Sequence, residues 1–337
     1  MLIRERTEQL EHTLLSPYAA FADQSQGRAT EEPQCDTRTC FQRDIDRITY
    51  SKAFRRLMHK TQVFLQPEGD HFRTRMTHTL EVSRIARTIA FGLRLNENLV
   101  EAMALGHDLG HTPFGHAGEV ALSQATGKPF RHNEQSLRVV DLLERNGLGL
   151  NLCNETRMGI LCHSWKAQEP TSLEGWVLRY ADRIAYINHD VDDAMRAGFL
   201  TEAELPSAIT DVLGTSHSRR INTLVQELIA SSVDRPCLQM NPEIYDAMEA
   251  LRKFMFERVY HHPAVQAEDR KAQEILERLF TYFMKHPEEI PQDFRPQMDF
   301  DGLERVVCDY IACMTDKYAI YRYQELFIPI SLHTRKV

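Results

Sequence analysis

Long hydrophobic runs are missing from the 337-residue sequence, in which no apolar stretch approaches the roughly 20 residues that a membrane-spanning helix needs. The opening residues, Met-Leu-Ile-Arg-Glu-Arg, are too highly charged for a signal peptide. The seven cysteines are an odd number in a chain without secretory features, which favours reduced thiols over a disulfide framework. We therefore expect a cytoplasmic protein that has no membrane partner.

Several common ligand-binding motifs are also absent. There is no glycine-rich phosphate loop of the Walker or the dinucleotide-binding type, so side chains and a metal ion would have to bind any phosphate. Cys35 and Cys40 could begin a zinc site, but no second pair of cysteines or histidines follows at zinc-finger spacing. Nucleic-acid binding stays possible, but the net charge of −8 and the low aromatic content do not indicate it.

Alternating strand patterns are scarce, and helical periodicity dominates instead. A short hairpin around Pro67 is the one β-structure that we expect, over residues 61–73. Residues 172–196 are predicted to form one long helix, because their apolar residues recur at steps of four and three and must face other helices. Further helices are predicted at 78–93, 98–107, 131–146, 155–164, 242–260, 268–285, 299–314 and 316–325. The predicted fold class is all-α.

Histidines and acidic residues are concentrated in residues 107–119, His-Asp-Leu-Gly-His-Thr-Pro-Phe-Gly-His-Ala-Gly-Glu. This segment contains no lysine or arginine, and a packed core does not require such a composition. The adjacent His107 and Asp108 could both ligate one divalent metal ion. A single histidine is more often a hydrogen-bonded core or cap residue, so a metal site needs further ligands from elsewhere.

Two other predicted helices supply such ligands. His78 lies on the inward face of the helix over 78–93, and the apolar spacing of the next helix places His107 on its buried side. Asp182 lies within an apolar helix, where an unpaired carboxylate would be costly. The four predicted metal ligands are therefore His78, His107, Asp108 and Asp182.

Basic residues precede this cluster, and a possible acid–base pair follows it. Residues 43–75 contain eight basic and four acidic residues, a charge of +4 that suits a solvated helix face or a wall facing an anionic ligand. Arg75 is the clearest candidate for the second role, because it lies one helical turn before His78. His116 and Glu119 are three residues apart, so the carboxylate could fix the imidazole for proton transfer.

The order of the ligands, a histidine, a histidine–aspartate pair and a final aspartate, resembles the HD superfamily of metal-dependent phosphohydrolases. Longer motifs are similar to the deoxyguanosine triphosphate triphosphohydrolase-like family within it. These motifs are Phe41-Gln-Arg-Asp, Ser51-Lys-Ala-Phe-Arg-Arg-Leu, Lys60-Thr-Gln-Val-Phe, Arg73-Thr-Arg-Met-Thr-His-Thr-Leu-Glu-Val, the segment 107–119, His132-Asn-Glu-Gln, Ala181-Asp-Arg-Ile-Ala-Tyr-Ile-Asn-His-Asp and Asp309-Tyr-Ile-Ala-Cys-Met-Thr-Asp-Lys-Tyr-Ala. They extend over nearly the whole chain.

The resemblance implies an HD-domain multi-helix bundle with an additional C-terminal helical region. We expect an N-terminal arm over residues 1–42 and an HD catalytic core over residues 43–200. Residues 201–337 would form a helical region packed on the core, within one structural unit. Residues 201–245 are less regular, and they could be an inserted lobe or a subunit contact.

The resemblance also implies a reaction and roles for single residues. A dNTP, with dGTP expected, would be hydrolysed to the deoxynucleoside and tripolyphosphate, with a divalent metal ion (Mg, Mn or another transition metal) as cofactor. His116 and Glu119 match the catalytic pair, and His111 matches a position that contacts the phosphates or lines the site. The positions implied to bind substrate are Gln62 (base), Arg75 and Arg183 (phosphates), Tyr186 and Asp190 (sugar) and His132.

Two alternatives stay open. Another HD phosphohydrolase, such as a nucleotidase or a cyclic-nucleotide phosphodiesterase, would keep the four ligands but leave the motifs at 43–75 and 309–319 unexplained. A non-catalytic nucleotide sensor would not need the pair of His116 and Glu119. The expected partners are the dNTP substrate and further copies of the chain in a homo-oligomer, and a second dNTP could bind as an allosteric activator.

Overall fold

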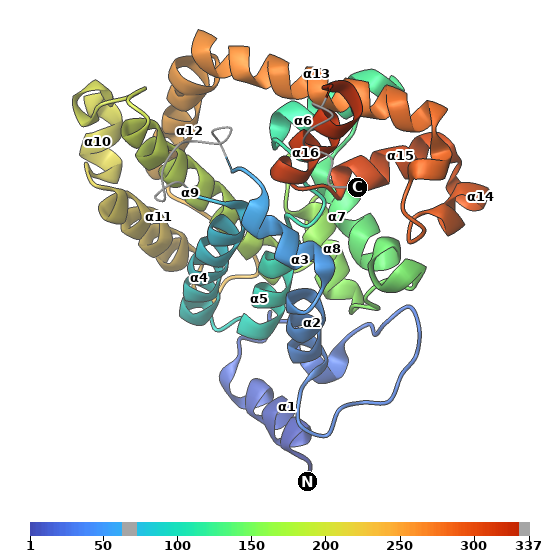
Figure 1. Cartoon of the computed structure of the whole chain (residues 1–337). Helices are drawn as coiled ribbons and strands as arrows, with labels where there is room; N and C mark the ends of the chain where they lie inside the picture. Colours follow the sequence, from blue (N-terminus) through green and yellow to red (C-terminus); the bar gives the residue numbers. More distant parts are fainter. Residues whose placement is uncertain (63–72, 330–337) are drawn as a thin grey trace.

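Helices make up almost all of the regular structure in the computed structural model, which describes residues 1–62 and 73–329 (Figure 1). No strand occurs in these two ranges, and their β-type pairings are isolated bridges. The all-α prediction is therefore confirmed. The hairpin predicted over residues 61–73 lies almost entirely outside the described residues.

The N-terminal residues form an arm at one edge of the molecule, at the lower end of Figure 1. The helix of this part is α1 (Ile3–Leu14). The next two helices, α2 (Cys40–Thr49) and α3 (Lys52–Arg56), lie nearer the centre of the molecule, where α2 packs against the helix of residues 97–106. Between α1 and α2 the chain is irregular apart from one short 3₁₀ turn. Arg28 attaches this irregular stretch to the core, because its guanidinium donates to Asp44 (2.5 Å) and to the carbonyls of Asn151 (2.6 Å) and Cys40 (2.8 Å).

Three helices build the central core, and a fourth packs against two of them. They are α4 (Arg75–Leu93), α5 (Glu97–Gly106), α9 (Leu173–Arg196) and, packed on α5 and α9, α8 (Asn154–Cys162). The side chains of Thr74, Asn96 and Ser172 cap the first turns of α4, α5 and α9. The apolar stripe predicted for residues 172–196 is buried in α9, as expected.

Two shorter helices, α6 (His116–Thr126) and α7 (His132–Arg138), lie between α5 and α8 in the sequence. The sequence predicts one helix over residues 131–146, but the α-helix ends with α7. The second half consists of a π-helical turn (Val139–Leu143) and a 3₁₀ turn (Glu144–Gly147). Arg145 and Asn146 have φ angles of 53° and 57°, so a right-handed helix cannot continue there.

The C-terminal part packs on the central helices. Its elements are α10 (Ser207–Leu213), α11 (His217–Ser232), α12 (Pro242–Met255), α13 (Pro263–Lys285), α14 (Met298–Asp301), α15 (Leu303–Ala312) and α16 (Asp316–Phe327). Helices α11 and α12 pack against α9, while α13 crosses the molecule and packs against α6, α15 and α16 (Figure 1). Among the described helices, none is both long and apolar enough to cross a membrane.

Two features of this part differ from the prediction. Residues 201–245 were predicted to be less regular, but they contain α10 and α11. Pro206 and Gly214 do not interrupt a helix there, because they lie at the two ends of α10. The helix predicted over residues 299–314 is divided into α14 and α15 at Gly302, whose φ of 80° ends the first of them.

Candidate metal and catalytic site

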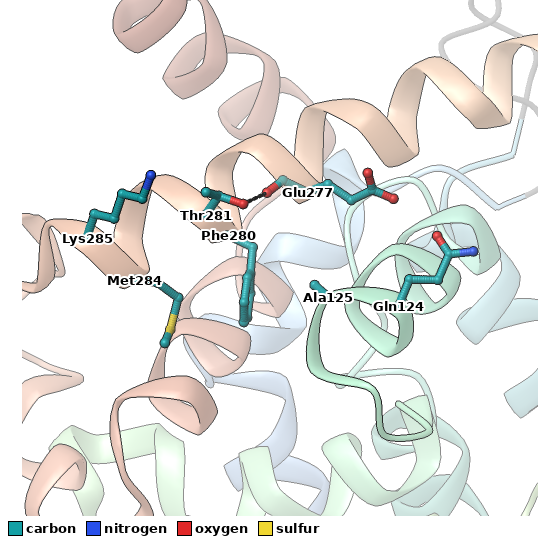
Figure 2. A pocket seen from close by; sticks show the side chains of 7 residues that line it. All are labelled: Gln124, Ala125, Glu277, Phe280, Thr281, Met284 and Lys285. Carbon is teal, nitrogen blue, oxygen red and sulfur yellow. Dashed lines mark hydrogen bonds between the residues drawn. The ribbon is translucent and has the colours of Figure 1, made fainter.

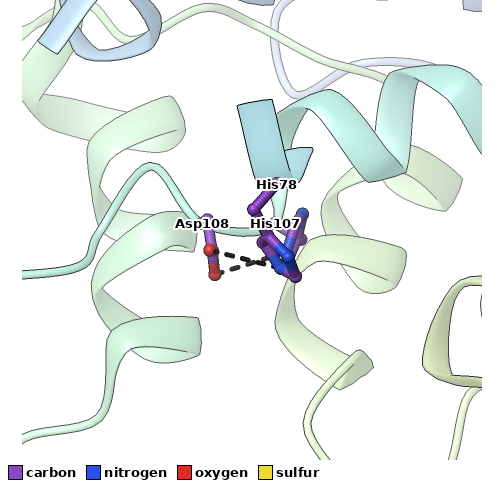
Figure 3. A group of neighbouring side chains, drawn as sticks. All are labelled: His78, His107 and Asp108. Carbon is purple, nitrogen blue, oxygen red and sulfur yellow. Dashed lines mark ion pairs between the residues drawn. The ribbon is translucent and has the colours of Figure 1, made fainter. Parts of the chain in front are cut away.

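The four side chains predicted to bind a metal ion lie together. His78 stands near the start of α4, His107 and Asp108 directly follow α5, and Asp182 lies in the middle of α9. The potential ligand atoms of the buried His78, His107 and Asp108 all lie within 4.8 Å of one another (Figure 3). Oδ1 of Asp182 is 3.3 Å from Nε2 of His78 and 3.8 Å from Nε2 of His107. Three helices thus bring the four donor groups to one place.

The hydrogen bonding of His107 fits a metal ligand. Its Nδ1 lies 2.7 Å from the carbonyl oxygen of Ala104, so an N–H at Nδ1 donates to this carbonyl. Nε2 then carries the lone pair, and this buried atom has no hydrogen-bond partner among the described residues. It lies 3.3 Å from Oδ1 of Asp108. A buried lone pair beside carboxylates, in a mixed imidazole and carboxylate donor set, fits a divalent metal ion.

Asp108 also contacts basic groups that are not predicted ligands. Nη1 of Arg75 donates to its Oδ2 at 2.8 Å, and Nε2 of His111 lies 3.2 Å from its Oδ1. Burial alone would raise the pKa of Asp108, but the surrounding basic groups outweigh burial and hold this pKa well below its usual range. The pKa of Asp182 is lowered in the same way, against its burial, by the hydrogen bond to His78. Both carboxylates are therefore ionised at neutral pH, as metal binding requires.

Glu119 joins two imidazoles. Its Oε2 lies 3.1 Å from Nδ1 of His116, the neighbour expected from the three-residue spacing. Its Oε1 lies 2.6 Å from Nδ1 of His132 and accepts the backbone N–H of the same residue at 2.9 Å. Burial alone would raise the pKa of Glu119, but the charge of His132 and the hydrogen bonds to both imidazoles lower it far below its usual range. The side chain of His116 is 82 % exposed, so a substrate could reach it.

His163, directly after α8, extends this row of imidazoles and was not predicted from the sequence. Its Nδ1 donates to the carbonyl of Ile160 at 2.7 Å, so its Nε2 is an acceptor. Nε2 of His132 lies 3.1 Å away and donates to it. Because His132 donates from both nitrogens it carries a positive charge, and Glu119 raises its pKa against the effect of burial. Burial lowers the pKa of His163 to about 3.

His111 lies between His132 and Asp108. Its ring stacks on that of His132, with centroids 3.9 Å apart and 12° between the planes. Burial and the charge of Arg75 hold the pKa of His111 well below its usual range, so this imidazole is neutral. Asp108, His111 and His132 also have potential ligand atoms close enough together for a metal ion. Both nitrogens of His132 are already hydrogen-bonded, however, so the group that contains His107 is the better metal site.

Arg183 follows Asp182 on α9, and two groups from outside this helix hold its guanidinium. The guanidinium carbon lies 3.8 Å from the ring centre of Trp165, a cation–π contact. Nη1 of Arg183 forms an ion pair with Glu249 of α12. Neither Trp165 nor Glu249 was predicted, because each comes from a distant part of the sequence and nothing local distinguishes it.

Tyr186 and Asp190 follow Asp182 along α9 at intervals of one turn. The hydroxyl of Tyr260, from the π-helical turn after α12, donates to Oδ2 of Asp190. Burial raises the pKa of Asp190 to about 7 and also raises the pKa of the Tyr186 phenol. Tyr260 is thus a further residue of this group that the sequence did not reveal.

Gln62 lies beside the turn that leads to His116. A Cβ atom added to Gly115 would be 3.7 Å from the carbonyl oxygen of Gln62 and only 2.9 Å from Nη2 of Arg75. Gly115 also has a φ of 55°, a backbone angle that residues with a side chain rarely adopt. A glycine is therefore required here, and it lets Arg75 approach the backbone just before His116.

A separate groove of about 460 Å³ lies between α6 and α13 (Figure 2). Gln124 of α6 and Phe280 and Met284 of α13 are among the side chains that line it. None of the residues predicted to bind metal or substrate lines this groove. The cluster around Asp108 is therefore the stronger candidate for a functional site.

Two family models match the chain. The HD domain matches residues 75–187, which include all four predicted metal ligands and the pair of His116 and Glu119. The phosphohydrolase-associated domain matches residues 238–325, which contain α12 to α15 and most of α16.

Several relatives are similar to nearly the whole chain. A deoxyguanosinetriphosphate triphosphohydrolase-like protein of Caldanaerobacter subterraneus is 54 % identical over 329 residues, which cover 98 % of this chain and 97 % of the relative. A protein of the same name from Desulfatibacillum aliphaticivorans is 48 % identical and covers 98 % and 99 % of the two chains. Among solved structures, a phosphohydrolase from Bacteroides thetaiotaomicron matches with a TM-score of 0.53 at 17 % identity, over 84 % of this chain and 69 % of that chain. This last similarity concerns the fold alone.

Proposed function

The chain belongs to the deoxyguanosinetriphosphate triphosphohydrolase-like family of HD-domain proteins, and we propose that it hydrolyses a deoxynucleoside triphosphate to the deoxynucleoside and tripolyphosphate. The observation that carries this proposal is the convergence of the four predicted ligands in a protein that also pairs the exposed His116 with Glu119. Hydrolysis of a phosphoester needs positive charge around the phosphoryl oxygens and a proton donor for the leaving oxygen. Groups of both kinds are present.

His78, His107, Asp108 and Asp182 would hold the divalent ion, Mg²⁺, Mn²⁺ or another transition-metal ion. When bound, this ion supplies Lewis-acid chemistry to a phosphoryl oxygen and makes hydroxide available near neutral pH. Arg75 orients Asp108 through the 2.8 Å hydrogen bond and keeps it ionised. Its guanidinium lies between Asp108 and the turn at Gly115, where it could also contact a phosphate.

His116 is the proposed proton donor to the leaving O5′ oxygen. Its Nδ1–H donates to Glu119, which fixes the tautomer and the ring orientation and leaves Nε2 of an exposed side chain to exchange the proton. Glu119 is itself held by His132 on its other oxygen. We assign Glu119 the role of orienting His116, and His111 a place beside the phosphates.

Positive charge for the triphosphate would come from Arg75, Arg183 and His132. His132 is suited to this role because its two hydrogen bonds require a proton on each nitrogen. Tyr186 and Asp190 would contact the sugar, since they continue along α9 from Asp182, and Gln62 would contact the base.

Product analysis tests the proposal. The purified protein is stripped of metal with a chelator, supplied with Mg²⁺ or Mn²⁺ and incubated with dGTP, and the products are identified by anion exchange and ³¹P NMR. We expect equal amounts of deoxyguanosine and tripolyphosphate, and no turnover without added metal. Asp182→Asn, prepared in parallel, should be inactive, which controls for a contaminating phosphatase.

Other products would support the alternatives. Orthophosphate from dGTP, or turnover of nucleoside monophosphates or cyclic nucleotides in place of dGTP, would favour another HD phosphohydrolase. Nucleotide binding without turnover would favour a nucleotide sensor. The exposed and hydrogen-bonded His116 favours an enzyme, because nucleotide binding alone does not need an imidazole held in one tautomer.

A further inference from the structure

The motif that begins at Asp309 has no part in the chemistry described so far, yet one of its acidic residues contacts the site. Asp316 is the first residue of α16, and only 3 % of it is exposed. Its carboxylate is not needed to cap α16, because the hydroxyl of Thr315 accepts the N–H of Tyr318 at 3.2 Å and serves as the cap. A buried carboxylate must therefore have other partners.

These partners come from two segments near the catalytic pair. Oδ1 of Asp316 accepts the backbone N–H of Phe114 at 2.9 Å. Oδ2 accepts the backbone N–H of Thr61 at 2.9 Å and also the hydroxyl of Thr61. Each oxygen thus holds a different segment, and one carboxylate joins the residues just before His116 to those just before Gln62.

The turn at Phe114 needs such support. Phe114 and Gly115 have φ angles of 62° and 55°. A residue other than glycine adopts a left-handed conformation only where its surroundings hold it there. Gly115 is also the N-cap of α6 and has no side chain that could fix the first turn of this helix. The direction in which α6 presents His116 therefore depends on the turn that Asp316 holds.

Lys60 makes a second connection of the same kind. Its buried ammonium donates to the carbonyl of His111 and, at 2.7 Å, to the carbonyl of Ala312 at the end of α15. The carbonyl of Lys60 accepts the N–H of Arg75 at 3.0 Å. The loop of residues 111–115 is thus attached at both ends to the turn between α15 and α16, at His111 through Lys60 and at Phe114 through Asp316.

We propose that Asp316 is a positioning residue for the hydrolysis, which acts by fixing the turn at Phe114 and Gly115 so that His116 reaches the leaving oxygen. This inference rests on the proposed function, because it assigns Asp316 a role through His116. It gives the C-terminal helices a part in the reaction without any contact to the substrate. The competing explanation is that Asp316 anchors α16 and contributes to stability alone.

The substitution Asp316→Asn removes the connection with little change in shape. One of the two oxygens becomes an NH₂ group, which cannot accept a hydrogen bond from Phe114 or from Thr61, whichever segment it faces. Glu144→Gln is a matched control. Glu144 is also buried, and its two oxygens accept the backbone N–H groups of Lys52 (3.1 Å) and Ala53 (2.7 Å) at the start of α3.

Kinetics with dGTP separate positioning from anchoring. We expect Asp316→Asn to lower kcat about 10- to 100-fold, because a small misplacement of a reacting group is costly, while KM and metal content stay within about 2-fold. In the background of His116→Ala, Asp316→Asn should lower kcat further by less than about 3-fold, because the two residues act through the same step. The proposal would be overturned if Asp316→Asn and Glu144→Gln lowered kcat equally. It would also be overturned if Asp316→Asn lowered kcat by the same factor in the His116→Ala background as in the wild type.

Hydrogen exchange measures the position of the loop without any turnover. In Asp316→Asn, the amides of Thr112 and of residues 114–119 should exchange at least about 10-fold faster than in the wild type, and Glu144→Gln should leave them unchanged. If the wild type releases no tripolyphosphate, the proposed function is wrong, but this exchange still shows whether Asp316 holds the turn. Unchanged exchange in Asp316→Asn would overturn the inference even in an active enzyme.

Discussion

The carboxylate of Glu119 lies 2.6 Å from Nδ1 of His132, and its other oxygen lies 3.1 Å from Nδ1 of His116. One buried acid therefore connects a buried imidazole with an exposed one. His132 is held in its charged form by this contact and by the acceptor on His163, and its charge in turn keeps Glu119 ionised. The fixed anion orients the ring of His116 so that Nε2 points away from Glu119, as a proton donor requires.

His116→Ala should lower kcat for dGTP by roughly 10²–10⁴-fold, the usual loss for one general acid–base group. Metal content and dGTP affinity should stay near those of the wild type, because the side chain is exposed and lies outside the predicted ligand set. Steady-state kinetics and metal analysis of the same preparation check both expectations. Loss of metal would instead make His116 a ligand.

Glu119→Gln should lower kcat at least as much as His116→Ala, because the amide weakens the hydrogen bonds to both His116 and His132. The double variant should be little worse than the worse of the two single variants, since the residues act as a unit. Comparing kcat for the three variants tests this. Losses that multiply fully would mean that Glu119 and His116 act independently.

Replacing His107 or Asp182 by alanine should remove the bound metal and reduce turnover to background, while the helical content stays near that of the wild type. His107 offers a buried lone pair that has no hydrogen-bond partner in the described part of the chain, and Asp182 approaches both predicted histidine ligands. Elemental analysis after dialysis and circular dichroism measure the two quantities. His261→Ala, at an exposed position, is the control. Full metal occupancy in both alanine variants would disprove the assignment.

The sequence predicted those parts of the site that lie on single, strongly periodic helices. His78, Asp182 and the line from Asp182 to Asp190 could be placed because the apolar spacing of α4 and α9 fixes which face is buried. The contact of His116 with Glu119 could be predicted from a spacing of one turn. In each case a local pattern determines the geometry.

The missed residues reach the site from distant parts of the chain. His163, Tyr260 and Asp316 contact groups 31, 70 and 202 residues away, and no local periodicity encodes such distances. Helices α10 and α11 were missed for another reason. Prolines and glycines that mark helix ends looked like interruptions, although Pro206 precedes α10 and Gly214 ends it.

Tyr186→Ala should reduce the preference for dGTP over GTP by roughly 10-fold or more, if the phenol occupies the space beside C2′ of the sugar. Tyr186 is suited to this role because it lies one turn beyond Asp182 and is partly buried. Tyr186→Phe keeps the ring and should retain most of the preference. The preference is measured as the ratio of the kcat/KM values for dGTP and GTP. A wild type that hydrolyses both equally would exclude the idea.

Asp190 should make the stability of the metal-free protein depend on pH in a defined direction. Burial raises the pKa of this carboxyl from 3.8 to about 7, its Oδ1 has no hydrogen-bond partner among the described residues, and Tyr260 donates to Oδ2. Between these two pKa values the folded state holds a proton that the unfolded state has released. Stability therefore falls as pH rises through this range.

Asp190→Asn removes this dependence, because an amide does not titrate. We expect the free energy of unfolding of the wild type, relative to Asp190→Asn, to fall by on the order of 2–3 kcal/mol between pH 5 and pH 7 and to level off above pH 8. Chemical unfolding at several pH values measures the difference, and any constant effect of the substitution cancels because only the slope is used. Asp211→Asn, at an exposed position on α10, should keep the pH dependence of the free energy of unfolding that the wild type shows. A difference that stays constant or rises over this range would show that Asp190 is ionised in the folded protein at pH 5, which the burial of its carboxyl group makes unfavourable.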